Sequence, residues 1–122
     1  MTFVNPTKTV RLEVIGETTY EKFEGEFTFK ILLTMTEQHD LELAYSRLLG
    51  DLENPSQNLT LIARIRSNLR FYIINSPMWW KDSDGGAQLF DFNVLLELQT
   101  LLNQSISEFR ENQKKKAEEK NS

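Results

Sequence analysis

The sequence contains no cysteine and a single histidine, His39. Without cysteine the chain can form no disulfide and no thiolate metal site, and it suits a reducing cytoplasm. The acidic neighbours Glu37 and Asp40 lie two positions and one position from His39, and such neighbours do not share a face of a helix. A Gly-rich phosphate loop is missing as well. We therefore expect no catalytic site, no metal and no cofactor, and a protein that is not an enzyme.

Long apolar runs and an excess of positive charge are also missing. No stretch approaches the roughly 20 apolar residues of a membrane span, and residues 1–30 show no secretory signal. The net charge is -4 and the isoelectric point is near 5.0, whereas binding to phosphates draws on a positive surface. These absences predict a soluble intracellular protein with no membrane and no nucleic acid among its partners.

The apolar residues that are present suffice for one small core. Hydrophobic residues make up 39% of the 122 residues, which fits a single domain. Residues 10–15 and 25–31 alternate between apolar and polar side chains, the pattern of half-buried strands. Residues 17–24 have the composition of a turn, although Phe23 would also fit an edge strand. We expect an antiparallel hairpin with helices over its apolar face, because a hairpin alone is marginally stable.

Helical spacing begins after the hairpin. Thr34 and Glu37 have the spacing of a capping box, Thr36 is an alternative cap, and Gly50 is a natural stop. A first helix is therefore expected over residues 36–49. Its inward face would comprise Leu41, Ala44, Tyr45 and Leu48.

A second helix, residues 54–75, is expected to organise the rest of the chain. Asn54 is a good N-cap, and Pro55 suits the first turn because its missing N–H would have no partner there. Pro77 disfavours helical geometry at Ser76, so the helix should end about there. Apolar residues recur at steps of three and four on one face: Leu59, Ile62, Ile65, Leu69 and Ile73.

Three arginines, Arg64, Arg66 and Arg70, lie along this second helix. Arg66 and Arg70 share a face, because they are four positions apart. With Phe71 and Tyr72 nearby, the arginines would allow an RNA-binding patch. The acidic chain as a whole favours the other interpretation, in which they keep the outer face soluble or pair with acidic neighbours.

A third helix, residues 92–110, is expected after a loop over residues 81–88, with Asp91 as its cap. Its stripe comprises Leu95, Leu98, Leu102, Ile106 and Phe109. The apolar surface is wider than that stripe, because it also includes Leu89, Phe90, Phe92, Val94, Leu96 and Leu101. A small domain can hardly bury all of it, so the excess indicates a groove or a contact between copies of the chain.

The fold class predicted by these patterns is a small α+β domain over residues 10–110, with an N-terminal hairpin followed by three helices. Residues 1–9 are expected to form a flexible arm. Residues 111–122 are almost wholly charged or polar, and we expect a frayed helix end or a disordered tail.

The most unusual feature is the run Met78-Trp79-Trp80, which contains both tryptophans. One interpretation is that a Trp closes the hydrophobic end of the helix pair. The other is that a Trp stays exposed and binds a partner, since Trp is enriched at binding hot spots. Both can hold together. The residues predicted to contact a partner are Met78, Trp79, Trp80, Leu89, Phe90, Leu98 and Leu102.

The order of the motifs resembles the small tail assembly chaperones of long-tailed bacteriophages. The resemblance covers about residues 10–110. It rests on the Gly-x-Phe-x-Phe segment at 25–29, the Leu-Leu-Gly helix end at 48–50, and the Pro-x-Trp-Trp segment at 77–80. None of these segments is a catalytic signature. The three arginines and the charged tail have no place in the family pattern.

The resemblance implies a chaperone that acts in the host cytoplasm and is absent from the finished tail. It implies the tape measure protein as partner, with tail tube subunits as a second candidate, and we also consider a homo-oligomer. A tape measure chain is long, helical and apolar on one face, and a small acidic domain with surplus Leu and Trp surface can cover such a face. The alternative is a structural accessory subunit of the head, neck or tail of the virion.

Overall fold

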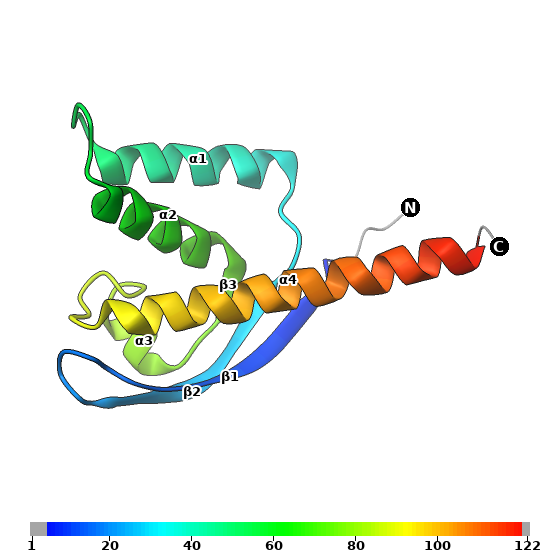
Figure 1. Cartoon of the computed structure of the whole chain (residues 1–122), viewed down its shortest axis with the longest axis horizontal. Coiled ribbons are helices and arrows are strands. Elements are labelled where there is room, and N and C mark those ends of the chain that lie inside the picture. The colour runs from blue at the N-terminus through cyan, green and yellow to red at the C-terminus, as the bar shows by residue number, and fades with distance from the viewer. Residues whose placement is uncertain (1–4, 121–122) are drawn as a thin grey trace.

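The computed structural model describes residues 5–120. Within that range the chain has an α+β fold, as predicted, with one antiparallel sheet in the order β1-β2-β3 and four helices (Figure 1). The elements are β1 (Thr7–Ile15), β2 (Lys22–Lys30), α1 (Met35–Leu49), α2 (Gln57–Tyr72), β3 (Ile73–Asn75), α3 (Met78–Asp82) and α4 (Phe92–Lys120). The short β3 and α3 were not expected from the sequence.

The predicted N-terminal hairpin is confirmed, and it is longer than expected. β1 begins at Thr7, so residues 7–9 belong to the sheet and not to a flexible arm. Residues 1–4 of that expected arm lie outside the described residues. β1 and β2 pair in antiparallel register, with Val10 opposite Phe27. Side chains alternate across a strand, so every second residue of the hairpin faces the core.

The predicted capping box of α1 is present. The Thr34 hydroxyl accepts a hydrogen bond from Glu37 N at 3.2 Å, and the Glu37 carboxylate accepts one from Thr34 N at 3.0 Å. Lys30 at the end of β2 forms an ion pair with the same carboxylate, which joins the sheet to α1. Gly50, with a φ of 64°, ends the helix as expected. Of the predicted inward face, Leu41 and Ala44 are buried, Tyr45 is half-buried and Leu48 is exposed.

α2 is shorter at both ends than predicted. Its N-cap is Ser56, whose hydroxyl accepts a hydrogen bond from Leu59 N at 3.1 Å. Asn54 has a φ of 56°, whereas an N-cap residue needs an extended backbone, so the predicted cap is wrong. At the other end, Tyr72 is the last helical residue, and the following β3 pairs with β2. The two isoleucines of β3 are β-branched, which favours a strand. Pro77 disfavours helical geometry at the preceding residue, Ser76.

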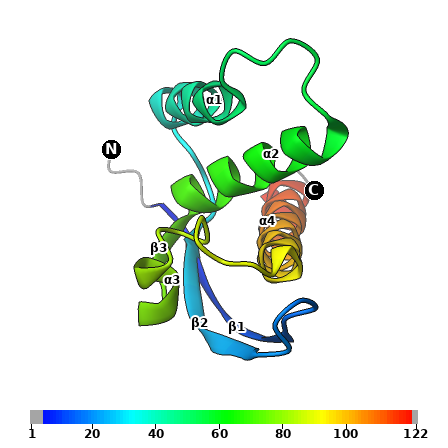
Figure 2. The same cartoon turned by 90° about the vertical axis from the view of Figure 1, so that its left-hand side faces the viewer.

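The core lies between the sheet and the helices α2 and α4. α4 packs against β1 and α2, and α1 packs on α2, so α2 lies between α1 and α4 (Figure 2). α1 therefore belongs to the layer farthest from the sheet. The buried apolar cluster comprises Leu12, Phe27, Phe29, Ile31, Ile65, Leu69, Trp80, Val94, Leu95, Leu98 and Leu102.

The charged C-terminal segment is helical, which corrects the expected disordered or frayed tail. α4 continues to Lys120, and residues 110–120 are exposed. This end of α4 extends beyond the rest of the molecule (Figure 1). The segment consists mainly of Lys and Glu, which are good helix formers, and pairs such as Glu111 and Lys115 have the favourable i, i+4 spacing. Residues 121–122 lie outside the described part of the chain.

Candidate partner-binding surface

α3 places both tryptophans on the sheet. Trp80 is 5% exposed, and its ring meets that of Phe27 edge-on, with ring centroids 5.6 Å apart. Trp79 is half-buried, and its Nε1 donates a hydrogen bond to the backbone oxygen of Glu24 at 2.9 Å. Both rings therefore attach α3 to β2, which favours the core-closing interpretation of the pair. Met78 is 68% exposed and is the member of the run that faces solvent.

The residues predicted to contact a partner divide by burial. Trp80, Leu98 and Leu102 are core residues, Trp79 and Leu89 are half-buried, and Met78 and Phe90 are exposed. The three core residues are inaccessible while the domain is folded, because α4 packs Leu98 and Leu102 into the core and α3 packs Trp80 against Phe27. Phe90 precedes α4 and remains 80% exposed. The predicted set therefore does not form one accessible surface.

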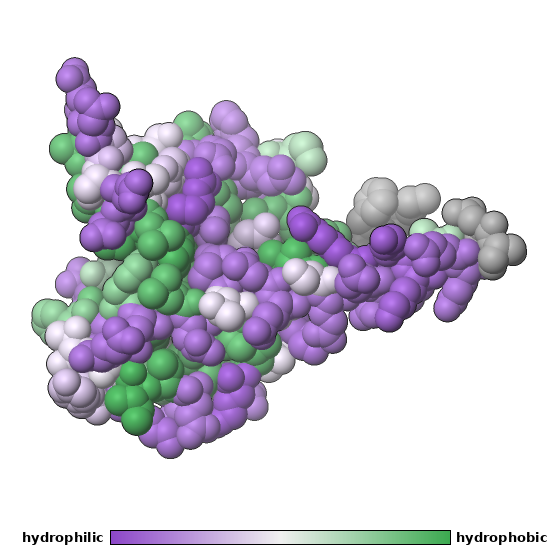
Figure 3. Space-filling model, in the orientation of Figure 1, coloured by the Kyte–Doolittle hydropathy of each residue, from purple (hydrophilic) through white to green (hydrophobic). Residues whose placement is uncertain are grey.

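The α1–α2 hairpin carries more accessible apolar surface than sequence patterns predicted. Its leucines are 41% to 58% exposed at Leu43, Leu48, Leu52, Leu59 and Leu61. Leu48 of α1 and Leu59 of α2 were expected on inward faces, but both are exposed. Figure 3 shows hydrophobic residues over α1 and α2, whereas the extending end of α4 is hydrophilic. Helical periodicity located Leu48 and Leu59 but could not show that they are accessible, and it did not identify Leu43, Leu52 or Leu61.

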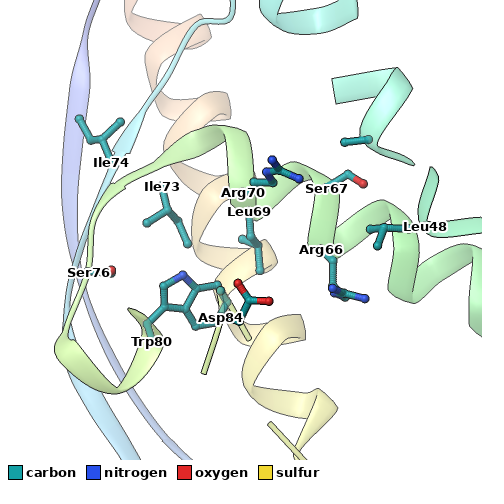
Figure 4. Close-up of a pocket in the computed structure, with 12 residues that line it drawn as sticks. Leu48, Arg66, Ser67, Leu69, Arg70, Ile73, Ile74, Ser76, Trp80 and Asp84 are labelled. Atoms are coloured by element: carbon teal, nitrogen blue, oxygen red, sulfur yellow. The ribbon is translucent and has the colours of Figure 1, made fainter. Parts of the chain in front are cut away.

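A pocket of about 420 Å³ lies beside α2, on the side of β3 and α3 (Figure 4). Leu69, Ile73 and Trp80 give it an apolar lining. Arg66 and Arg70, one turn apart on α2, also line it. Among the described residues, neither guanidinium lies within ion-pair distance of a carboxylate. We refer to this site as the two-arginine pocket.

Arg64 lies on another side of α2 and has an acidic partner, as expected from the sequence. Its guanidinium donates hydrogen bonds to both carboxylate oxygens of Glu42, at 2.8 and 3.2 Å, and lies 3.8 Å from the centre of the Tyr45 ring. These hydrogen bonds hold the pKa of Glu42 below its ordinary value. A second pocket of about 450 Å³ borders this pair, and there Asn68 donates a hydrogen bond to Gln99 at 3.2 Å. Asn68 and Gln99 of the second pocket thus already satisfy each other.

Asp91 has a role that the sequence did not reveal. It was predicted to cap α4, but it is 1% exposed and its carboxylate accepts hydrogen bonds from the β1–β2 turn. The donors are Thr18 N at 2.6 Å, Thr19 N at 3.0 Å and the Thr19 hydroxyl at 2.6 Å. The hydroxyl is the main cause that holds the pKa of Asp91 below its ordinary value. Gly16 permits this approach, since a Cβ there would lie 2.4 Å from the carboxyl carbon of Asp91.

Among the described residues, no cluster of three or more His, Asp or Glu side chains could hold a metal ion. No helix within residues 5–120 has the length and apolar character needed to cross a membrane. Comparison of the chain with protein-family models, with curated proteins and with solved structures gives no match.

Proposed function

We propose that this protein is a non-enzymatic tail assembly chaperone of a long-tailed bacteriophage, which covers apolar surface of the tape measure protein before the tail polymerises. Two of the segments that carry the resemblance pack against each other. The Phe27 ring of the Gly-x-Phe-x-Phe segment meets those of Trp79 and Trp80 in the Pro-x-Trp-Trp segment, with centroid distances of 5.7 and 5.6 Å. These two segments therefore form one structural unit, and this contact supports the resemblance to the chaperone family.

The observation that carries the proposal is the exposed apolar surface of the α1–α2 hairpin. Five leucines are exposed there, although the core between the sheet, α2 and α4 is already formed by other residues. Apolar area gains free energy when it leaves water, so these exposed leucines favour contact with a partner. A surface of this kind is suited to a partner with apolar surface of its own.

The proposed partner has matching chemistry. A tape measure chain is long, helical and apolar on one face, so it aggregates when unshielded. An amphipathic helix can lay its apolar face against exposed leucines, which is the helix-in-groove mode of recognition. Met78 and Phe90 are the exposed members of the predicted contact set, and they would form a second contact outside the hairpin. Tail tube subunits remain a second candidate for the same contact.

Co-expression tests the proposal. The tagged chain is produced together with the tape measure and tail tube proteins of the same genome, and soluble complexes are identified after affinity purification. We expect soluble tape measure protein only when this chain is present. Tape measure protein that is equally soluble alone, or that never co-purifies, would contradict the chaperone function. Detection of the chain in purified virions would favour the alternative, a structural accessory subunit.

A further inference from the structure

The two-arginine pocket combines an apolar lining with charge on two sides. Arg66 and Arg70 belong to α2, and Asp84 lines the pocket from the segment between α3 and α4. Figure 4 shows Trp80 and the Asp84 carboxylate on one side of the pocket and the two arginines on the other. No ion pair links Asp84 to either guanidinium within the described chain. The pocket therefore presents positive and negative groups that a ligand can still reach.

The arginines favour an anionic ligand group. Guanidinium groups bind carboxylates through charge-assisted hydrogen bonds, which are stronger than neutral ones. Arg64, on the same helix, already forms such a pair with Glu42. Arg66 is half-buried and Arg70 is exposed, with its guanidinium 5.9 Å from the centre of the Phe71 ring. Both cations are thus available for a carboxylate from outside the described chain.

The neighbouring sheet edge favours a polypeptide over a small anion. β3 is an outer strand of the sheet, since it follows β2 in the order β1-β2-β3. Ile73 and Ile74 of β3 line the pocket, and Ile74 is 48% exposed. An outer strand can pair with an added extended chain, and alternate side chains of that chain then enter adjacent pockets.

We infer that the two-arginine pocket binds an acidic, apolar polypeptide segment that lies along β3, with a carboxylate side chain at Arg66 and Arg70 and an apolar side chain against Leu69, Ile73 and Trp80. This inference rests on the proposed function in one respect only, because it assigns the segment to the tape measure protein. Asp84 determines which charge the segment can carry next to that carboxylate, since Asp84 repels a second carboxylate and attracts a basic residue. Of the exposed leucines, Leu48 also lines this pocket, whereas Leu52 and Leu59 do not.

The experiment uses the full chain and three labelled synthetic peptides that differ only in charge. The acidic probe is Thr-Leu-Thr-Glu-Thr-Leu-Thr with blocked ends, in which the Glu and Leu side chains lie on one face of an extended chain. Its Glu is replaced by Gln or by Lys in the other two. Fluorescence polarisation gives the affinities, and ¹⁵N NMR gives the location of binding. We expect the acidic probe to shift the resonances of β3 and of the Trp80 indole. We expect its affinity to exceed that of the Gln probe about tenfold and to fall as salt is added.

Variants identify the groups responsible. Arg66→Gln with Arg70→Gln should weaken binding of the acidic probe about tenfold, because it removes both cations. Asp84→Asn should strengthen that binding, because it removes a like charge. Arg47→Gln is the matched control, since Arg47 is an exposed arginine of α1 that does not line the pocket. Thermal melts of each variant confirm that it is folded.

The outcomes separate the two proposals. The inference would be overturned if the acidic and Gln probes bound with equal affinity, or if the double arginine variant bound the acidic probe as tightly as the parent chain does. Resonance shifts confined to elements other than β3 and α3 would also overturn it. If the folded double arginine variant still recovers tape measure protein as well as the parent chain does, the assignment of the segment to that protein is wrong while the chaperone function stands. If the parent chain binds the acidic probe as expected but recovers no tape measure protein, the pocket stands and the chaperone function fails.

Discussion

Gly25 of β2 lies directly against the ring of Pro77. A Cβ at position 25 would be 2.6 Å from Pro77 Cγ, and Gly25 has a φ of 152°, which side chains rarely allow. This contact joins the strand to the start of α3, and Trp79 of α3 reinforces it through its hydrogen bond to Glu24. The absence of a side chain at position 25 therefore lets α3 and its tryptophans sit on the sheet.

The first prediction concerns this contact. Gly25→Ala should lower the free energy of unfolding by at least about 2 kcal/mol, because it adds overpacking to backbone strain. Gly50→Ala is the control, since a Cβ there has no atom within 4 Å and only its φ of 64° causes strain. The control should cost about 1–3 kcal/mol, because the φ of 64° and ψ of -151° at Gly50 are adopted almost only by glycine. Urea denaturation measures both, and an equal or smaller loss at Gly25 would disprove the close contact.

The second prediction concerns Asp91 and pH. Its pKa in the folded protein lies below the ordinary value of 3.8, so its carboxylate stabilises the fold above that value, and the contribution disappears as the pH falls through the folded pKa. Asp91→Asn should lower the melting temperature near neutral pH, and the difference from the parent chain should shrink in acid. Thr19→Val, which removes a donor to Asp91, should act in the same direction.

Asp82→Asn serves as the control for Asp91, because Asp82 is an exposed aspartate. It should leave the melting temperature nearly unchanged at every pH. A difference between Asp91→Asn and the parent chain that stays constant from neutral to strongly acidic pH would show that the ionised carboxylate is not what stabilises the turn.

The third prediction separates the two roles found within the Met78-Trp79-Trp80 run. Trp80→Ala should destabilise the domain by about 3–5 kcal/mol, because it empties part of the core. Met78→Gln combined with Phe90→Gln should change stability by no more than about 0.5 kcal/mol per site, since both side chains are exposed. The same double variant should recover less tape measure protein. Full recovery by the folded double variant would remove these residues from the contact.

The fourth prediction tests the leucines of the α1–α2 hairpin. Leu52→Gln with Leu59→Gln should leave the melting temperature close to that of the parent chain, because both residues are exposed. Recovery of soluble tape measure protein should fall severalfold, since interface apolar area is lost. Leu96→Gln on α4, which is 41% exposed, is the matched control. If the control reduces recovery as much as the double variant, the hairpin is not the specific contact.

The fifth prediction concerns the beginning of α2. Ser56→Ala should cost about 1 kcal/mol, because the hydroxyl that accepts from Leu59 N is lost. Asn54→Gly should cost nothing, since Asn54 has a left-handed backbone that glycine adopts freely. Chemical denaturation distinguishes these results. A larger loss at Asn54 than at Ser56 would restore the helix start predicted from the sequence.

The sequence by itself determined the features that depend on near neighbours in the chain. The alternation of apolar and polar side chains predicted the β1–β2 hairpin, because one face of each strand is buried and the other is exposed to solvent. Thr34 and Glu37 predicted the start of α1, since a capping box needs only residues three positions apart. Gly50 predicted its end. The sequence also located the tryptophans and arginines as unusual features, although it left their roles open.

Only the tertiary structure decided the features that depend on distant residues. Residues 73–75 form β3 because β2 offers them a partner, which local helix periodicity cannot reveal. Asp91 became a link to the hairpin because Thr18 and Thr19, more than seventy positions away, supply its donors. Burial of Trp80 and exposure of the α1–α2 leucines were likewise set by which layers stack on which. Local hydrogen bonding and periodicity fix the elements, whereas long-range packing fixes which of their faces a partner can reach.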